Sequence, residues 1–162
     1  MAKNKEEKTN VMRVLEQKKI AYSAHTYPHE EGVAVDGVTV AQSMGFDPAI
    51  VFKTLVARGA SKQYYVFDVP VAENLDLKKA AKAVGEKSIE MIHQKELLPL
   101  TGYVHGGCSP VGMKKLFPTV FHSSAENLAA MIVSAGKIGY QVELAPHDLA
   151  ALVRAKFADI IA

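Results

Sequence analysis

The sequence predicts an α+β fold in which a mixed β-sheet curls around a pocket. Three observations support this class. Several short apolar runs have strand character, a few amphipathic runs carry helix caps, and the two kinds do not alternate in a regular β-α-β rhythm. A length of 162 residues with 49% hydrophobic and 22% charged residues fits one globular domain over residues 1–162.

The first part of the chain predicts two helices and two strands. Asn10 is a good N-cap for a helix with an apolar face. A strand is expected over 20–27, followed by a loop with acidic residues and glycines. A short helix over 39–44 ends at Gly45, which can adopt the left-handed C-cap conformation. The run 50–58 is the next strand, and its two apolar blocks indicate that it is mostly buried.

The second part continues with a hairpin through the turn 59–61 into a strand over 63–69. A helix over 76–84 ends at Gly85. Further helices are expected at 94–98, ahead of Pro99, and from Pro146 onward, and further strands at 88–92, 119–122, 130–134 and 140–144, with 103–105 extended.

Composition excludes several classes of protein. A net charge of +2 is far from the basic balance of proteins held mainly by phosphate contacts. Five lysines could still form a weakly basic face, although solvated lysines are the more common explanation: Lys78, Lys79, Lys82, Lys114 and Lys115. No run is apolar enough to span a membrane, and the N-terminus has no hydrophobic signal region. A single cysteine fits a reducing compartment, so we expect a cytoplasmic protein without a membrane partner.

Lys53 is the most informative candidate residue. It stands between two apolar blocks of one strand, so its side chain either snorkels to the edge or enters a polar cavity. The glycine-rich run 106–112 lacks the spacing of a nucleotide-binding P-loop. The turn 134–137 could aim backbone N–H groups at a carbonyl or an anion, although hairpin geometry alone would also explain its glycine.

Other reactive residue types give weaker signals. The six histidines show no metal-ligand spacing, so we expect neither a metal nor another cofactor. Cys108 beside Ser109 could be a nucleophile with His105 as base, but a lone cysteine is more often a small buried residue. Tyr27 could be a core aromatic or a wall against which a base or ribose packs.

Three segments taken in order resemble the YbaK/EbsC family: Val51-Phe52-Lys53-Thr54-Leu55-Val56, Gly102 through Gly112, and Val133-Ser134-Ala135-Gly136-Lys137. Shorter matches at 25–27, 75–79 and 156–160 extend the resemblance over nearly the whole chain. The family is related to the editing insertion of bacterial prolyl-tRNA synthetase. The resemblance implies a mixed, partly barrel-like sheet with flanking helices, and deacylation of cysteinyl-tRNA(Pro) without a cofactor.

The same resemblance implies roles for individual residues. Lys53 would be the essential cation at the terminal adenosine or the ester. Thr54 after this lysine is typical of the cysteine-editing branch, whereas alanine-editing relatives tend to carry asparagine. The implied substrate-binding residues are Tyr27, Thr54, Gly106, Gly107, Ser109, Ser134, Ala135 and Gly136. The partners would be the acceptor end of aminoacyl-tRNA and, by analogy, prolyl-tRNA synthetase.

Two departures from the family pattern leave the substrate range open. Gln141 stands where an aspartate is expected, and His105 and Cys108 replace apolar residues in the glycine-rich loop. The alternatives are a deacylase for another small amino acid and a non-catalytic module that binds tRNA or a synthetase. The resemblance also implies a mechanism, because cysteine-specific members of the family are thought to use the substrate's own thiol as the attacking group. The absence of a recognisable catalytic triad in this sequence agrees with that expectation.

Overall fold

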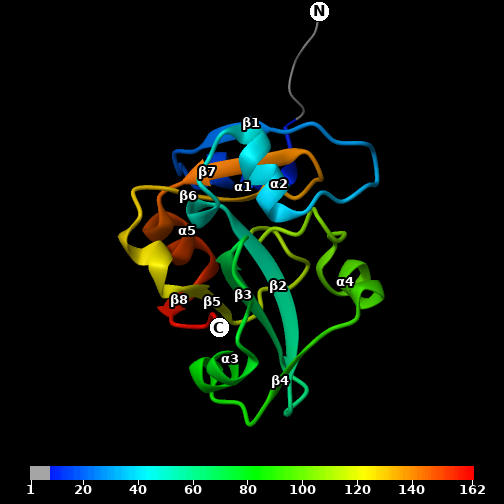
Figure 1. Cartoon of the computed structure of the whole chain (residues 1–162), viewed down its shortest axis with the longest axis vertical. Coiled ribbons are helices and arrows are strands. Elements are labelled where there is room, and N and C mark those ends of the chain that lie inside the picture. Colours follow the sequence, from blue (N-terminus) through cyan, green and yellow to red (C-terminus); the bar gives the residue numbers. More distant parts are fainter. Residues whose placement is uncertain (1–7) are drawn as a thin grey trace, which may run out of the picture.

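The computed structural model describes residues 8–162, which form two β-sheets with flanking helices (Figure 1). The helices are α1 (Asn10–Gln17), α2 (Gly37–Met44), α3 (Leu77–Val84), α4 (Gln94–Thr101) and α5 (Pro146–Val153), with 3-10 turns η1 (Pro48–Ile50) and η2 (Ser123–Asn127). The strands are β1 (Ser23–Thr26), β2 (Phe52–Gly59), β3 (Tyr64–Pro70), β4 (Ile89–Met91), β5 (Thr119–His122), β6 (Met131–Ser134), β7 (Tyr140–Leu144) and β8 (Ala155–Ala158).

The smaller sheet has the strand order β1-β7-β6 and is antiparallel. The larger sheet has the order β4-β2-β3-β5-β8 and is mixed, because β4-β2-β3 pair antiparallel and β3-β5-β8 pair parallel. A parallel bridge between Val51 and Ile132 joins the two sheets. The predicted α+β class with a mixed sheet is therefore confirmed, and the sheets do not close into a complete barrel.

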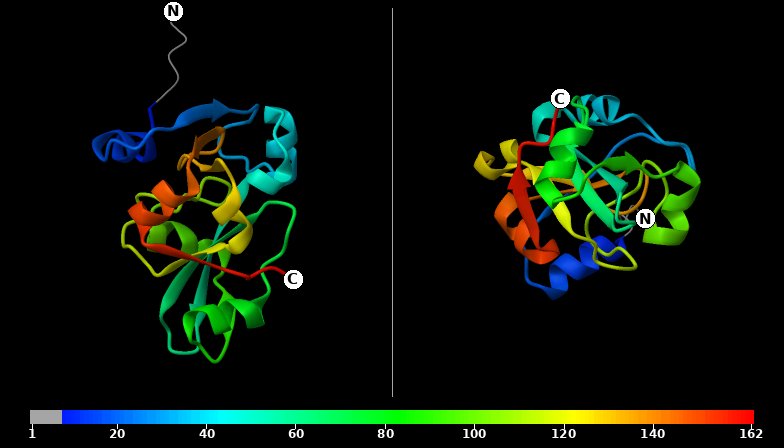
Figure 2. Two further views of the ribbon diagram at one scale, coloured as in Figure 1. Left: turned by 90° about the vertical axis from the view of Figure 1, so that its left-hand side faces the viewer. Right: turned by 90° about the horizontal axis from the view of Figure 1, so that it is seen from below.

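Apolar side chains hold these layers together at two ends of the molecule. At one end, α1 buries Val11 and Leu15 against the small sheet and α5. At the other end, Ala80 and Ala81 of α3 pack against the β2-β3 hairpin, which contributes Phe67 to this cluster. Figure 1 and the left view of Figure 2 show α1 and α3 at these opposite ends. Within residues 8–162, no helix has the length and apolar character needed to cross a bilayer.

Several predicted boundaries need correction. The N-cap of α1 is Thr9, whose side chain accepts a hydrogen bond from the Met12 N–H, and Asn10 is already helical. The first strand begins only at Ser23. Helix α4 does not stop before Pro99 but continues to Thr101. Its last turn is held by other bonds, including that from the Thr101 hydroxyl to the Leu97 carbonyl at 2.7 Å, which compensate for the donor that proline lacks.

Two elements were not expected from the sequence, and one expected element is absent. Strand β8 follows α5 directly, and the helix ends at Arg154 in the left-handed conformation instead of at a glycine, so the usual stop signal is missing. The 3-10 turn η2 was also not predicted. Residues 103–105, expected to be extended, belong to no strand. The charged N-terminal residues 1–7 lie outside the described part of the chain.

Candidate active site

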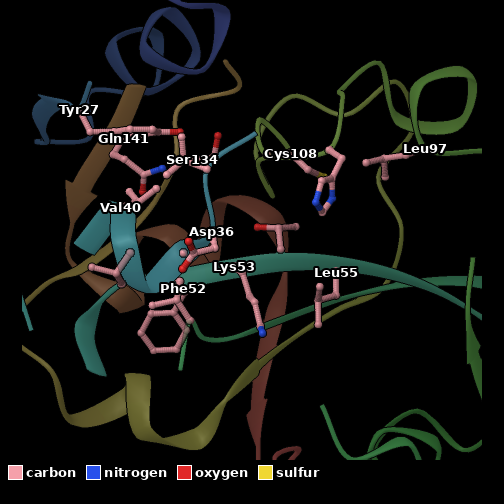
Figure 3. A pocket seen from close by; sticks show the side chains of 17 residues that line it. Tyr27, Asp36, Val40, Phe52, Lys53, Leu55, Leu97, Cys108, Ser134 and Gln141 are labelled. Carbon is pink, nitrogen blue, oxygen red and sulfur yellow. The ribbon is translucent and has the colours of Figure 1, made fainter. Parts of the chain in front are cut away.

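A cavity of about 300 Å³ lies where the two sheets meet (Figure 3). One wall is the start of β2 over residues 51–55. The opposite walls come from the N-terminal segment with Tyr27 and α2, from the glycine-rich loop after α4, and from the ends of β6 and β7. Segments far apart in the sequence therefore converge on one hollow.

Five of the nine residues that the sequence singled out line this cavity: Tyr27, Lys53, Thr54, Gly106 and Ser134. The other four do not line it, although each is next to or close in sequence to a residue that does: Gly107, Ser109, Ala135 and Gly136. Ser109 and Ala135 are fully buried. Ser109 acts within its own loop, where its hydroxyl accepts a hydrogen bond from the Val111 N–H at 3.2 Å.

The edge of β2 is free along the cavity. Strand β4 pairs with β2 only from Ala57 to Gly59, so the segment 53–55 has β3 on one side and, within residues 8–162, no strand on the other. Because successive side chains of a strand point to opposite faces, Lys53 and Thr54 flank this free edge from opposite sides. Figure 3 shows Lys53 extending from β2 away from Cys108. The cavity thus wraps around the strand edge.

Lys53 is half-buried and is not held by other side chains. Its ammonium group makes no hydrogen bond or ion pair with residues 8–162. Burial lowers the pKa of Lys53, and the negative charge of Glu73 partly opposes this shift. A partly desolvated cation without a fixed partner can bind an anionic or carbonyl oxygen of a ligand with little competition.

The turn after β6 is closed by its own hydrogen bonds. The Ala135 N–H donates to the Tyr140 carbonyl at 3.0 Å, and the Gly136 N–H donates to the Ser134 hydroxyl, also at 3.0 Å. These two amides are engaged within the turn, which favours hairpin geometry over the alternative that they bind a carbonyl or an anion. Ser134 itself still reaches the cavity, and its hydroxyl keeps a proton to donate.

The glycine-rich loop needs glycine because it packs against neighbouring backbone. Gly106 has φ near +90°, and a side chain there would place Cβ 2.7 Å from the Cβ of Ala34. At Gly107 a Cβ would lie 3.1 Å from the Ile138 nitrogen. Both glycines therefore let this loop close one wall of the cavity.

Cys108 is poorly suited to act as a nucleophile. It lines the cavity but is buried, and its pKa is raised to about 12, first by burial and second by the charge of Asp68. The thiolate that nucleophilic attack requires is therefore strongly disfavoured. His105 also lines the cavity from the same loop, where its side chain is exposed.

Comparison with known proteins identifies the family. The sequence model described as an aminoacyl-tRNA editing domain matches residues 32–152. The chain belongs to this family. A relative from Enterococcus faecalis (strain ATCC 700802 / V583), EbsC, is named as a candidate Cys-tRNA(Pro)/Cys-tRNA(Cys) deacylase; it is 46% identical over 99% of this chain and 98% of its own length.

Solved structures show the same fold as this editing-family chain. The crystal structure of a candidate trans-editing enzyme for prolyl tRNA synthetase has a TM-score of 0.79 at 25% identity, covering 94% of each chain. A second crystal structure, of a hypothetical protein, has a TM-score of 0.82 at 18% identity and covers 94% of this chain and 99% of that one. The second likeness supports the fold alone.

Sequence reasoning missed the most unusual side chain beneath the editing-family cavity. Asp68 is fully buried in β3, directly opposite Thr54 of β2, and its Oδ1 accepts a hydrogen bond from the Thr54 hydroxyl at 2.5 Å. A lone carboxylate inside the apolar run Tyr64–Pro70 was the available signal. Gln141, noted only as a departure, lines the cavity with a buried Oε1 that has no hydrogen-bond partner within residues 8–162.

Proposed function

We propose that this chain is a trans-editing hydrolase that deacylates mischarged aminoacyl-tRNA, with cysteinyl-tRNA(Pro) as its preferred substrate. The observation that carries the proposal is the cavity beside Lys53, in an editing-family chain that is 46% identical to EbsC over nearly its whole length. The cavity would receive the aminoacyl group, and Lys53 would neutralise charge at the ester or the terminal adenosine.

The attacking group in this proposal belongs to the substrate. The cysteinyl sulfur forms a bond to its own ester carbonyl carbon, the bond from that carbon to the tRNA oxygen breaks, and the thiol proton ends on the released tRNA hydroxyl. The resulting thiolactone then hydrolyses in water. Held in a productive geometry, an internal nucleophile can reach an effective molarity of about 10⁵ M or more. The buried, protonated state of Cys108 supports this choice, because that residue offers no thiolate.

The remaining cavity residues would hold the substrate in that geometry. Tyr27 is buried and offers an aromatic wall, and Ser134 offers a hydroxyl donor. Ala135 and Gly136 would act through their small size, by leaving room behind Ser134. Gly106 and Gly107 would act in the same way by allowing the glycine-rich loop to close over the acyl group.

The proposed partners follow from this chemistry. The acceptor end of aminoacyl-tRNA is the part that the cavity would bind. Likeness to a candidate trans-editing enzyme for prolyl tRNA synthetase supports a transient association with that synthetase, which would supply the tRNA identity that a small domain does not read. Since charged tRNA is used in translation, the cytoplasm is the proposed compartment.

The test is single-turnover hydrolysis of a panel of charged tRNAs by purified protein. Cysteinyl-tRNA(Pro) should react fastest, seryl-tRNA(Pro) far more slowly because a hydroxyl is a much weaker acid than a thiol, and the S-methylcysteinyl form not at all. Equal cysteinyl and seryl rates would point to enzyme-activated water. Preference for another small amino acid would indicate a deacylase specific for that amino acid. Binding without turnover would indicate a non-catalytic module that binds tRNA.

A further inference from the structure

Asp68 is a buried carboxyl group with no role in the mechanism proposed above. The residue has no exposed surface, and its neighbours in β3, Phe67 and Val69, are also fully buried. Its Oδ1 accepts the Thr54 hydroxyl, whereas Oδ2 has no hydrogen-bond partner within residues 8–162. Burying a carboxyl group with one of its oxygens unpaired is costly, so a role beyond packing is indicated.

Thr54 connects this carboxyl group to the cavity. It is the cross-strand partner of Asp68, so both side chains lie on the same face of the hairpin, and Thr54 also lines the cavity. A hydroxyl has one proton to donate and two lone pairs that accept. When ionised Asp68 takes that proton, Thr54 can offer the cavity only lone pairs. When Asp68 is protonated, its own O–H can donate to the Thr54 oxygen. The Thr54 hydroxyl proton can then point toward the cavity.

We propose that Asp68 is a positioning residue that fixes the Thr54 hydroxyl as a hydrogen-bond acceptor for the aminoacyl group of the bound substrate. This inference rests on the proposed function. The donor on a cysteinyl group is its thiol, so the arrangement would hold the S–H in place and help to draw its proton away as sulfur attacks the ester. Asp68 acts only through Thr54, because it does not line the cavity itself.

The titration of Asp68 gives the inference a measurable signature. Burial raises the pKa of Asp68 to about 7, and the hydrogen bond from Thr54 lowers it in part. The titratable group that faces it from the glycine-rich loop is Cys108, which stays protonated because its pKa is near 12. On β2, Lys53 lies on the opposite face from Thr54, and β5 places Phe121 beside Asp68. Asp68 should therefore switch to the ionised, accepting arrangement as the pH rises through about 7.

The experiment measures single-turnover hydrolysis of cysteinyl-tRNA(Pro) from about pH 5.5 to about pH 8.5 by the wild type, Asp68→Asn, Thr54→Val and the double variant. The ratio of the wild-type rate to the Asp68→Asn rate should be near one in acid and should rise to about tenfold above pH 7. In the Thr54→Val background, Asp68→Asn should have no further effect, because the connecting hydroxyl is gone.

Controls separate a positioning role from a structural one. Thr54→Ser keeps the hydroxyl, so its deacylation rate should depend on pH in the same way as the wild-type rate. Asp159→Asn removes an exposed carboxylate that pairs with Lys79 and should change nothing. Circular dichroism monitors folding. If Asp68→Asn does not fold, two other measurements test the inference. Thr54→Val should lose the pH dependence that the wild-type rate shows near pH 7, and the carboxyl resonance of Asp68 in the wild type should titrate near pH 7.

The outcomes distinguish this inference from the function on which it rests. A rate ratio that stays flat with pH, or additive effects of the two substitutions in an active enzyme, would overturn the role of Asp68 and leave the deacylase intact. A wild type that hydrolyses none of the charged tRNAs would remove the proposed function, and the role of Asp68 with it.

Discussion

The ammonium group of Lys53 is a cation at the cavity with no hydrogen-bond or ion-pair partner in the described part of the chain. We expect Lys53→Ala to abolish most deacylation and to leave the fold intact, since the side chain contributes charge and little packing. Losing one such contact should cost about 2 to 4 kcal/mol of transition-state stabilisation.

The measurement is the single-turnover rate on cysteinyl-tRNA(Pro), with circular dichroism as the folding control. Lys87→Ala is the matched variant, because Lys87 is an exposed lysine that does not line the cavity. It should retain the wild-type rate. A folded Lys53→Ala protein with near wild-type activity would remove Lys53 from the mechanism.

The Cys108 thiol is buried and its pKa is near 12. Cys108→Ser should therefore retain activity, because a protonated thiol is not a nucleophile. Rapid-quench mass spectrometry should find no acyl group on the protein. A trapped adduct on Cys108, or a serine variant without turnover, would show that the enzyme supplies the nucleophile.

Asp68 also makes the stability of the protein depend on pH. Its pKa in the folded state is near 7 and its ordinary value is 3.8, so between these values the folded protein holds a proton that the unfolded chain has lost. This contribution is complete in acid and is lost as the pH rises through about 7. From about pH 5 to about pH 8 the wild type should lose about 2 to 3 kcal/mol more unfolding free energy than Asp68→Asn.

Urea unfolding of both proteins at these two pH values measures that difference. The comparison cancels the other titrating groups, because they are common to both chains. Parallel pH profiles for the wild type and Asp68→Asn would mean that Asp68 titrates normally in the folded protein.

At the scale of elements, the glycine-rich loop is held in place by contacts that only glycine allows. Gly106→Ala should destabilise the protein and reduce deacylation, because its Cβ would lie 2.7 Å from that of Ala34. Gly85→Ala is the matched control. Gly85 also has positive φ, +76°, but its Cβ would meet nothing within 4 Å. That control should lose only the cost of a left-handed alanine, about 1 to 2 kcal/mol, and keep its activity.

Thermal unfolding and single-turnover rates of the two variants separate backbone strain from the steric clash. A Gly106→Ala protein as active and as stable as Gly85→Ala would show that the loop adapts without consequence for the cavity.

Elements with local signals in the sequence could be predicted, and those stabilised by distant contacts could not. Helix α3 was foreseen because its apolar residues share one face and Gly85 is a standard C-cap; Asp76, which was expected to be helical, is the N-cap in the structure. Strand β8 was missed because its pairing with β5 is the main signal for it, and that pairing joins residues far apart in the sequence. The carbonyl of Thr101 at the end of α4 also accepts a hydrogen bond from the Lys114 N–H, a contact with a distant residue that local patterns do not reveal.

The candidate site shows the same limit. Lys53 was singled out because a charge between apolar blocks is a local anomaly. Asp68 is a similar anomaly in the next strand, but its meaning depends on register: only pairing with Thr54 places it beneath the cavity. The engagement of the Gly136 amide by the Ser134 hydroxyl likewise depends on the shape of the turn and could not be predicted from its small residues.

At the scale of the whole molecule, the net charge of +2 limits the contact with RNA. Several lysines of the candidate basic face are already engaged, for example Lys79 with Asp159 at 3.0 Å. We expect about three phosphate contacts, so the slope of log affinity against log salt concentration should be near −2 to −3. Filter binding or fluorescence titration with charged tRNA at several salt concentrations measures it. A slope near −8 would reveal a much larger RNA interface.

The bridge between Val51 and Ile132 joins the two sheets, and Val51 itself lines the cavity. Ile132 is fully buried and does not line the cavity, yet it lies two residues before Ser134, which does. A change of one methylene group at Ile132 would shift β6 and alter the width of the hollow while every lining side chain stayed the same. Substrate preference in such a protein can evolve through substitutions of buried residues that do not line the cavity. Two chains with identical cavity linings therefore need not select the same amino acid.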